Sequence, residues 1–398
     1  MSSGSGYSAV IYRYNSICEP DYIKAFESLG INVIEIREEM TDKGITNSER
    51  VRLVEKAVTL HHPMFVFSIN FFPSVSDICS IYGVLYLCQT VDSPINQLFS
   101  ESVRHGTNRI FLFDKAQFQR FNRYNKDNIF HLPLCANTER YDEVISGITK
   151  EDRKKYSSDI SFVGSLYSEK TELNNIALSD YSRGYIDSLI HAQAQIYGCN
   201  FIEDALDKRV IDELKNKLPE VFAFDKSVED TDAYIAANSL IGYKLAEYER
   251  IDILNTLAKS FDVSLYTRSD TKVLKGVDVR GGVSTHTEMP KVFNLSRINL
   301  NITIRPIAAG IPLRVFDIMG CKGFVMTNYQ EELSELFKVG EEIEVFTDKD
   351  ELTEKCRYYL EHDEERARIA KNGYERVKGF HTFKHRVREM IRTVTAKQ

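Results

Sequence analysis

The run Ile311–Val325 holds the most informative spacing of reactive residues in the sequence. Pro312 suits the first turn of a helix, because the N–H that it lacks has no helical partner there. Arg314 lies in that first turn, where the helix dipole disfavours a cation unless an anion lies beside it. Asp317, one turn later on the same face, can accept the hydroxyls of a ribose. Pro312, Leu313, Arg314 and Asp317 are therefore candidates for binding a nucleoside diphosphate.

The plainer alternative for Arg314 and Asp317 is an i,i+3 ion pair on a surface helix. The neighbours of the pair are apolar, which predicts that the helix is largely buried and favours the functional interpretation. These neighbours are Val315, Phe316, Ile318 and Met319.

Asp92 follows the apolar run Val84–Cys88, in the sequence Gln-Thr-Val-Asp-Ser-Pro. A carboxylate at the carboxyl end of a strand can act as a general base toward a hydroxyl group. An N-cap or an Asx-turn before Pro94 explains the same residue equally well. The sequence leaves both explanations open.

Gly164 and Ser165 directly follow the apolar run Asp159–Val163. A glycine at the end of a buried strand lets backbone amides approach a phosphate, and the next helix adds positive potential. An ordinary strand-to-helix turn accounts for the two residues about as well. No G-x-G-x-x-G pattern occurs in the sequence, which disfavours a nicotinamide or flavin dehydrogenase.

The loop His286–Pro290 opens an expected helix over 291–296. His286 is a candidate for contact with a phosphate, although most loop histidines are simply solvated. Met289 and Tyr266 mark two places where backbone groups are candidates for holding a nucleotide base. The identity of the base depends on contacts that sequence does not orient.

Metal and cofactor sites are not expected. The nine histidines show no ligand spacing with cysteines or carboxylates, and the pair His381 and His385 lacks the Glu of an H-E-x-x-H motif. Asp348 and Asp350 have D-x-D spacing but belong to a polar turn before a helix. We therefore predict no metal requirement and no cofactor.

Composition narrows the class of protein further. The chain has 398 residues, of which 43% are hydrophobic and 27% charged, so two globular domains are expected. Its net charge of −7 disfavours nucleic acid as a partner. Seven scattered cysteines, an odd number without a C-x-x-C pair, indicate reduced thiols and a cytoplasmic location. No apolar run is long enough to span a bilayer.

Short apolar runs alternate with amphipathic helices, which is typical of parallel sheets in an α/β protein. A helical stretch over about 168–258 separates two such series, and we expect two Rossmann-like domains with a cleft between them. Strands are predicted at 8–14, 31–36, 64–68, 84–88, 110–113 and 129–132, and then at 159–163, 263–266, 299–304, 323–327 and 343–346.

The segments that carry these candidates resemble the CgeB-like glycosyltransferases, which have the GT-B fold. The similarity includes Asp92-Ser93-Pro94 in the first half, and it covers most of the chain while weakening across 168–235. The most specific run is Pro312-Leu313-Arg314-Val315-Phe316-Asp317. Further matching pieces are Phe67–Pro73, Ile110–Asp114, His131–Leu134, Val283–Pro290, Ser296–Asn301, Gly323–Val325 and His381–Phe383.

The resemblance implies an acceptor-binding domain over 1–150 and a nucleotide-sugar-binding domain over 151–378, with a helical insertion at about 168–258. It implies that 379–398 packs back on the first domain. The apolar stripe of the last helix, which includes Val387 and Met390, then has a packing partner. Binding of this basic helix to an anionic lipid surface is the competing interpretation.

The implied reaction is transfer of a hexose-type sugar from a nucleotide sugar, with a UDP-sugar favoured, in bacterial protein or cell-surface glycosylation. Related retaining enzymes carry an E-x7-E motif, whereas this sequence has Ala309 and Asp317 at the two positions. With Asp92 as the base, a single-displacement inverting reaction follows, and Arg314 stabilises the diphosphate. Stereochemistry is left open.

Two alternatives remain: a non-catalytic GT-B partner subunit, and a nucleotide-sugar epimerase or hydrolase on the same fold. The acceptor, whether protein, glycan or lipid-linked, is not readable from the sequence, and neither is assembly into a homo-oligomer.

Overall fold

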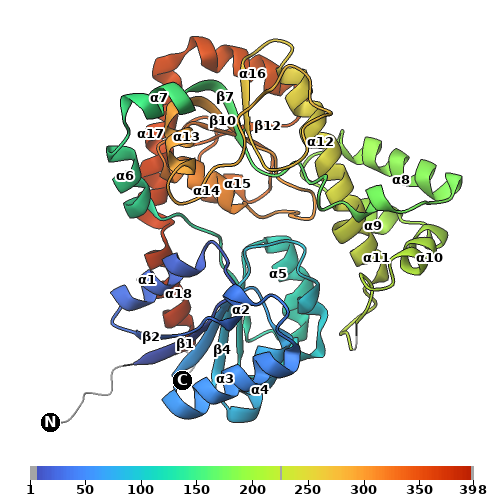
Figure 1. The fold of residues 1–398 in the computed structure, drawn as a ribbon, viewed down its shortest axis with the longest axis vertical. Coiled ribbons are helices and arrows are strands. Elements are labelled where there is room, and N and C mark those ends of the chain that lie inside the picture. The colour runs from blue at the N-terminus through green and yellow to red at the C-terminus, as the bar shows by residue number, and fades with distance from the viewer. Residues whose placement is uncertain (1–6, 225, 396–398) are drawn as a thin grey trace. The chain divides into compact units, whose positions relative to one another are not determined.

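The computed structural model describes residues 7–224 and 226–395, and the chain divides into two compact units. Both units are built around a parallel sheet, and each is described by itself (Figure 1). Unit 1 comprises Met1–Leu134, Phe224–Glu229 and Thr382–Gln398, and unit 2 comprises Cys135–Ala223 and Asp230–His381.

The sheet of unit 1 has six parallel strands in the order β2-β1-β3-β4-β5-β6. Its central strands β3 and β4 are mostly apolar, as expected for a sheet that is covered on both faces. Strand β3 is fully buried and β4 nearly so. The strands are β1 (Ser8–Tyr12), β2 (Asn32–Ile36), β3 (Phe65–Ile69), β4 (Leu85–Gln89), β5 (Asn108–Leu112) and β6 (Ile129–His131).

Local sequence signals explain where the helices of unit 1 begin. Thr46 and Glu49 form a capping box at the start of α3, and Pro73 occupies the first turn of α4. Right-handed crossovers place α1 on one face of the sheet and α3 and α4 on the other. These helices are α1 (Glu19–Ser28), α2 (Glu38–Thr41), α3 (Asn47–His61), α4 (Pro73–Tyr82) and α5 (Lys115–Phe121).

The last helix, α18 (Phe383–Thr395), packs beside α1 (Figure 1). Its residues Val387, Met390 and Val394 are at most 3% exposed, and the Phe383 ring meets the Tyr22 ring edge-on. The expected return of the C-terminal helix to the first unit is therefore confirmed. The apolar stripe is buried within the protein, so it is not a lipid-facing surface as the competing interpretation requires.

The sheet of unit 2 also has six parallel strands, in the order β12-β11-β10-β7-β8-β9. Strand β9 has only two residues, both exposed, and no apolar run in the sequence predicted it. The strands are β7 (Ser158–Val163), β8 (Val263–Tyr266), β9 (Asp278–Val279), β10 (Ser296–Asn301), β11 (Val325–Asn328) and β12 (Glu344–Phe346).

The helical region between β7 and β8 has two parts. Helix α12 (Gly242–Leu257) buries Ile253, Leu254 and Leu257 in the core of unit 2, so it belongs to the α/β layer. The expected insertion over 168–258 is therefore shorter than predicted. Its own helices are α8 (Asp180–Gln193), α9 (Ile202–Ala205), α10 (Lys208–Lys217) and α11 (Asp232–Tyr234).

The remaining helices of unit 2 surround the sheet. Helix α14 is almost entirely buried beyond its first turn, as the apolar sequence around Asp317 predicted. These helices are α6 (Thr138–Ser146), α7 (Lys150–Tyr156), α13 (Met289–Leu295), α14 (Leu313–Gly320), α15 (Leu333–Leu336), α16 (Lys349–Glu361) and α17 (Asp363–Phe380).

Two borders differ from the expected ones. Unit 1 ends at Leu134 rather than near residue 150, because α6 packs on α13 of unit 2. The short segment Phe224–Glu229 belongs to unit 1, although its flanks are in unit 2. There Val228 N donates to Phe99 O over 2.7 Å, and the Glu229 carboxylate accepts from Arg120.

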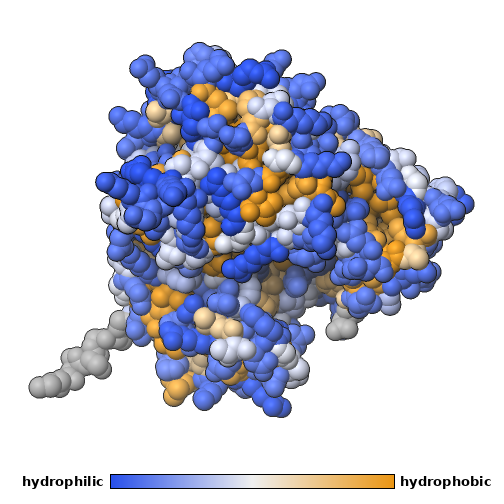
Figure 2. Space-filling view, turned by 45° about the horizontal axis from the view of Figure 1, so that its top comes forward, coloured by the Kyte–Doolittle hydropathy of each residue, from blue (hydrophilic) through white to orange (hydrophobic). Residues whose placement is uncertain are grey.

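Hydrophilic residues cover most of the face shown in Figure 2, and apolar side chains form separate patches. Among the described helices, none combines the length and apolar content that a membrane crossing requires.

Candidate functional site

In a parallel sheet the carboxyl ends of all strands meet at one edge, and ligands bind where the strand order reverses. In unit 2 this reversal lies between β7 and β10. The loops that follow these strands carry Gly164 and Ser165 on one side and residues 302–312 on the other. The candidates Gly164, Ser165, Pro312 and Leu313 therefore lie in or directly after loops at the carboxyl edge of the unit 2 sheet, whereas Asp92 belongs to unit 1.

Arg250, on α12, bridges the two loops at this reversal. Its Nη1 donates to Ser165 O over 2.5 Å, and its Nη2 donates to Ile302 O over 2.8 Å. Burial lowers the pKa of Arg250, and the nearby charge of Arg314 lowers it further. Neutral carbonyl groups accept from the two Nη atoms, and the buried Nε has no hydrogen-bond partner among the described residues. Arg250 thus places a positive charge at this edge that its own carbonyl partners do not cancel, with the carboxylates of Glu249 and Glu169 nearby.

Arg250 was missed by the sequence analysis. It lies on a helix that precedes β8, far along the chain from both loops that it joins, and it belongs to no motif. Only the strand order of the folded sheet brings it to the edge.

Arg314 lies in the first turn of α14, as predicted, and does pair with Asp317. Its Nη1 lies 3.1 Å from Asp317 Oδ2, and its guanidinium lies over the Phe293 ring at 5.4 Å. Its side chain remains 27% exposed. The plainer alternative of an i,i+3 pair is thus present, but it lies on a buried helix rather than a surface one.

Asp317 is 3% exposed, and protein groups already bond its carboxylate. Tyr141, on α6, donates to Oδ1 over 2.7 Å, and Arg314 donates to Oδ2. Burial and the negative charge of Asp317 hold the pKa of Tyr141 well above its usual value. The predicted role of Asp317 at a ribose remains a prediction, and it requires these contacts to rearrange.

The loop between β10 and α14 is fixed by side chains at and just after the end of β11. Asn328 Oδ1 accepts from Thr303 N over 2.7 Å. Gln330 Nε2 donates to Ile307 O over 2.8 Å and to Gly310 O over 3.1 Å. Pro312 and Leu313, which open α14, are therefore held in place before any ligand binds.

Gly164 and Ser165 follow β7 at the carboxyl edge, where they lie beside Tyr266, the last residue of β8. Gly164 N donates to Tyr266 O over 3.1 Å, and Ser165 Oγ accepts from Tyr167 N over 2.8 Å. The Tyr266 hydroxyl is engaged by Arg280 at 3.1 Å. The polar atoms of Tyr266 are thus used within unit 2, and its proposed contact with a base stays a prediction.

Glu288 anchors the loop that carries His286. Its carboxylate accepts from the Tyr156 hydroxyl over 2.5 Å and from Ser284 N over 2.9 Å. These bonds, together with Lys155, lower the pKa of Glu288 to about 2. Met289 follows at the start of α13, where its Sδ contacts the Arg314 guanidinium. Met289 therefore contacts Arg314 directly after a loop held by an ionised carboxylate, and the contact of His286 with a phosphate stays a prediction.

Asp92 lies in unit 1, in the loop after β4, and is exposed. Its Oδ2 accepts a 2.7 Å hydrogen bond from Nδ2 of Asn70, which directly follows β3. The same Nδ2 donates to the Tyr14 hydroxyl, after β1, over 3.0 Å. The carboxyl edge of unit 1 thus presents a carboxylate that is held by a side-chain amide rather than by a helix N-terminus.

A metal site is not evident in the described ranges, 7–224 and 226–395, where no group of three His, Cys, Asp or Glu side chains is arranged to hold an ion. Asp348, the first member of the D-x-D spacing, caps α16 by accepting from Glu351 N over 2.8 Å. This pattern has a structural explanation.

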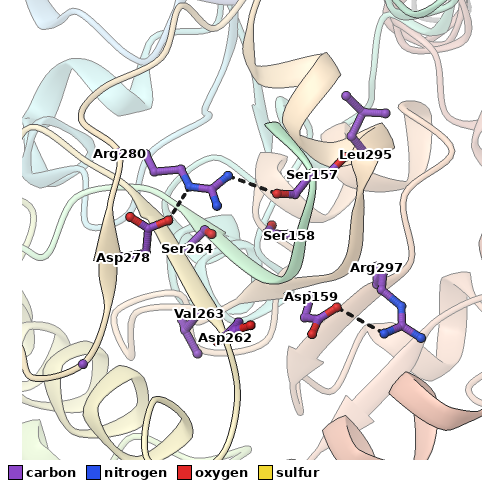
Figure 3. Close-up of a pocket in the computed structure, with 11 residues that line it drawn as sticks. Ser157, Ser158, Asp159, Asp262, Val263, Ser264, Asp278, Arg280, Leu295 and Arg297 are labelled. Atoms are coloured by element: carbon purple, nitrogen blue, oxygen red, sulfur yellow. Dashed lines mark hydrogen bonds and ion pairs between the residues drawn. The ribbon is translucent and has the colours of Figure 1, made fainter. Parts of the chain in front are cut away.

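A cavity of about 640 Å³ lies at the opposite edge of the unit 2 sheet, where β7, β8, β9 and β10 begin (Figure 3). The two arginines that line it are occupied: Arg280 donates to Asp278 and Ser157 O, and Arg297 donates to Asp159 and Asp363. Both guanidiniums are paired with carboxylates, and neither lies at a helix N-terminus or at the carboxyl edge of the sheet, so we do not assign the diphosphate to this cavity.

Comparisons with known proteins agree with this architecture. Residues 250–392 match a family model described as "Glycosyl transferase-like". No curated protein matches the chain. The segment matched includes Arg250, α13 and α14, which form the cationic edge.

Solved structures similar to the chain include a glycosyltransferase from Rickettsia africae, with 10% identity, a TM-score of 0.54 and coverage of 97% of each chain. Anabaena Alr3699/HepE, in complex with UDP and glucose, has 11% identity and a TM-score of 0.54 over 98% of this chain and 100% of that one. A sucrose-phosphate synthase from Thermosynechococcus elongatus has 11% identity and a TM-score of 0.53 over 98% and 100%. The chain has the GT-B fold, with two Rossmann-like units.

Proposed function

We propose that this protein is a glycosyltransferase that moves a sugar from a nucleotide-sugar donor to an acceptor hydroxyl. The observation that carries the proposal is the cationic edge of unit 2, where Arg250 and Arg314 lie beside the first turn of α14. A helix N-terminus with two arginines suits a diphosphate. The match of 250–392 to a glycosyl transferase-like model supports the same assignment.

The donor in this proposal is a UDP-sugar carrying a hexose. Structures with similar folds include Anabaena Alr3699/HepE in complexes with UDP and with UDP-glucose, which supports uracil as the base. The resemblance of the sequence to CgeB-like enzymes supports bacterial protein or cell-surface glycosylation. The acceptor is a hydroxyl of a protein, glycan or lipid-linked molecule.

The proposed reaction is a single displacement. The acceptor oxygen attacks the anomeric carbon, and the bond from that carbon to the diphosphate oxygen breaks. Asp92 takes the proton from the acceptor hydroxyl, while Arg250, Arg314 and the α14 amides stabilise the negative charge of the departing nucleoside diphosphate. Ala309, buried at 4% exposure, supplies no carboxylate at the first position of the E-x7-E motif. Inversion at the anomeric carbon is therefore proposed.

Thermal unfolding with UDP, GDP, CDP and TDP, each with and without EDTA, tests the donor site. A ligand at 100 times its Kd adds about 2.7 kcal/mol of stability. Of the four nucleotides, we expect only UDP to raise the melting temperature, and by the same amount with and without EDTA. Arg314→Ala should abolish this rise.

The matched control is Arg297→Ala. Arg297 lies on the same sheet but at the opposite edge, in ion pairs with Asp159 and Asp363. This variant should respond to UDP as the wild type does. If no nucleotide shifts the wild type, the donor-site assignment is wrong, and the non-catalytic partner subunit becomes the better proposal.

A nucleotide-sugar epimerase or hydrolase would use the same donor site without an acceptor. Turnover of UDP-glucose at full rate without added acceptor would identify that activity. We expect turnover to depend on an acceptor, because the carboxylate at the edge of unit 1 is exposed and suits a hydroxyl from solution.

A further inference from the structure

Asn70 occupies a strongly constrained position directly after β3. Its backbone is left-handed, with φ at 57°, a conformation that asparagine tolerates better than most residues. Its N–H donates to Gln89 O over 2.8 Å, and its carbonyl accepts from Ser68 Oγ over 2.7 Å. Bonds to Gln89 on β4 and to Ser68 on β3 thus hold the backbone without any contribution from the Asn70 side chain.

The side chain of Asn70 joins three loops at the edge of unit 1. Its Oδ1 accepts from Val91 N over 3.0 Å, and this bond fixes the orientation of the amide, because an N–H can only donate. Nδ2 then faces two acceptors, the Tyr14 hydroxyl at 3.0 Å and Asp92 Oδ2 at 2.7 Å. Each amide hydrogen therefore has one acceptor, and no donor capacity is left over.

Asp92 is held on one side only. Oδ2 accepts from Asn70, whereas Oδ1 has no hydrogen-bond partner within residues 7–224 and 226–395. Burial and the charge of Asp92 raise the pKa of Tyr14, so the phenol stays neutral and does not add a second negative charge. One carboxylate oxygen is thus fixed, and the other is presented to solvent.

We infer that Asn70 is a positioning residue for the transfer reaction: it holds the Asp92 carboxylate so that Oδ1 meets the acceptor hydroxyl. This inference rests on the proposed function, in which Asp92 is the base. An orienting partner of a catalytic base acts on the rate of the chemical step, as the third member of a catalytic triad does. Donor affinity depends on unit 2 and should not change.

A purely structural role is the competing explanation, because Asn70 also accepts the hydrogen bond from Val91 N and tolerates the left-handed backbone at this position. Two variants separate the roles. Asn70→Asp keeps the shape and an acceptor for Val91 N, but it replaces the donor toward Asp92 with a carboxylate oxygen. Asn70→Gly keeps the left-handed backbone at no steric cost and removes the amide.

Steady-state kinetics with UDP-glucose and an acceptor that the wild type glycosylates test the inference. We expect Asn70→Gly to lower kcat about 10-fold and Asn70→Asp about 100-fold, with the donor KM within about twofold of the wild type. His62→Gly is the matched control, because His62 is also left-handed, with φ at 44°, but caps the end of α3. It should retain the wild-type kcat.

A higher kcat for Asn70→Asp than for Asn70→Gly would overturn the inference, because a structural role predicts that order. An unchanged kcat with a raised donor KM would also overturn it. If Asn70→Asp does not fold, Asn70→Gly alone tests the inference: a lower kcat with an unchanged donor KM supports it, and an unchanged kcat overturns it. Absence of transfer by the wild type would instead count against the proposed function.

Discussion

The two sheets share one architecture but join their loops at the point of strand reversal with opposite chemistry. In unit 1 the reversal lies between β1 and β3, where the neutral amide of Asn70 reaches the Tyr14 hydroxyl. In unit 2 it lies between β7 and β10, where the Arg250 guanidinium bonds the carbonyls of Ser165 and Ile302. The fold thus fixes where a bridge forms. The charge of the edge comes from the bridging guanidinium in unit 2 and from Asp92, which the bridging amide bonds, in unit 1.

The difference extends to the groups around each bridge. The amide in unit 1 supports an exposed carboxylate, which can accept a proton. The guanidinium in unit 2 lies near a second arginine, and both suit an anion. In the proposed reaction these are the two charges required, one at the attacking hydroxyl and one at the leaving diphosphate.

The largest expected effect comes from removing the charge at the edge of unit 1. Asp92→Asn should lower the transfer rate by about 10²- to 10⁴-fold, because the variant cannot take a proton. The UDP-induced rise in melting temperature should be unchanged, since unit 2 is intact. Asp262→Asn, which alters an exposed carboxylate at the opposite edge of unit 2, is the control. Full activity of Asp92→Asn would contradict the proposal that unit 1 supplies the base while unit 2 binds the diphosphate.

Removing the bridge of unit 2 should affect nucleotide binding. Arg250→Ala should weaken UDP binding about 10-fold or more and lower the free energy of unfolding by about 2 kcal/mol, because charge-assisted hydrogen bonds to two loops are lost. Isothermal titration and denaturant unfolding measure the two quantities. An unchanged Kd would restrict Arg250 to a structural role.

An arginine in unit 1 provides the contrasting case. Arg386, on α18, donates to Pro133 O over 2.5 Å and to Leu134 O over 2.9 Å, and is 5% exposed. Arg386→Ala should lower the free energy of unfolding by about 2 kcal/mol, since buried carbonyls lose their donors. The UDP affinity of the folded variant should match the wild type. Weaker UDP binding by folded Arg386→Ala would mean that the loss of UDP affinity is not specific to the arginine of unit 2.

The smallest expected effect concerns the loop of unit 2 that carries His286. The pKa of Glu288 is lowered from 4.5 to about 2 in the folded protein. Its ionised form therefore stabilises the fold above pH 4.5, and this stability is lost as the pH falls toward 2. Because Glu288 is about one-third exposed, Glu288→Gln should cost about 1 kcal/mol at pH 7. Thermal unfolding at pH 7 and below pH 3 should show the difference between variant and wild type shrinking with acid.

The sequence predicted most strands because apolar runs such as Phe65–Ile69 end in glycine, proline or asparagine. It also predicted the burial of α14. It missed β9, whose two residues are exposed and carry no periodic signal, and it placed α6 in the wrong unit. That assignment depends on the contact between Tyr141 and Asp317, which are far apart in the chain.

The candidate site was predictable in part for a similar reason. Arg314 and Asp317 lie close together in the sequence, so their relation on one helix face could be read directly. Arg250 and Asn70 could not be identified in the same way, because each acts on loops from distant strands. The order of strands in a parallel sheet determines which loops lie side by side, and no local sequence pattern indicates that order.

The return of α18 to α1 has a consequence for how the chain is made. Unit 2 has all of its residues once His381 has been added, whereas unit 1 still lacks α18. At 5–20 residues per second, the ribosome takes roughly 10 to 50 s to continue from Leu134 to the last helix. During that time the face of α1 that α18 will cover stays open, so the unit that starts first is completed last.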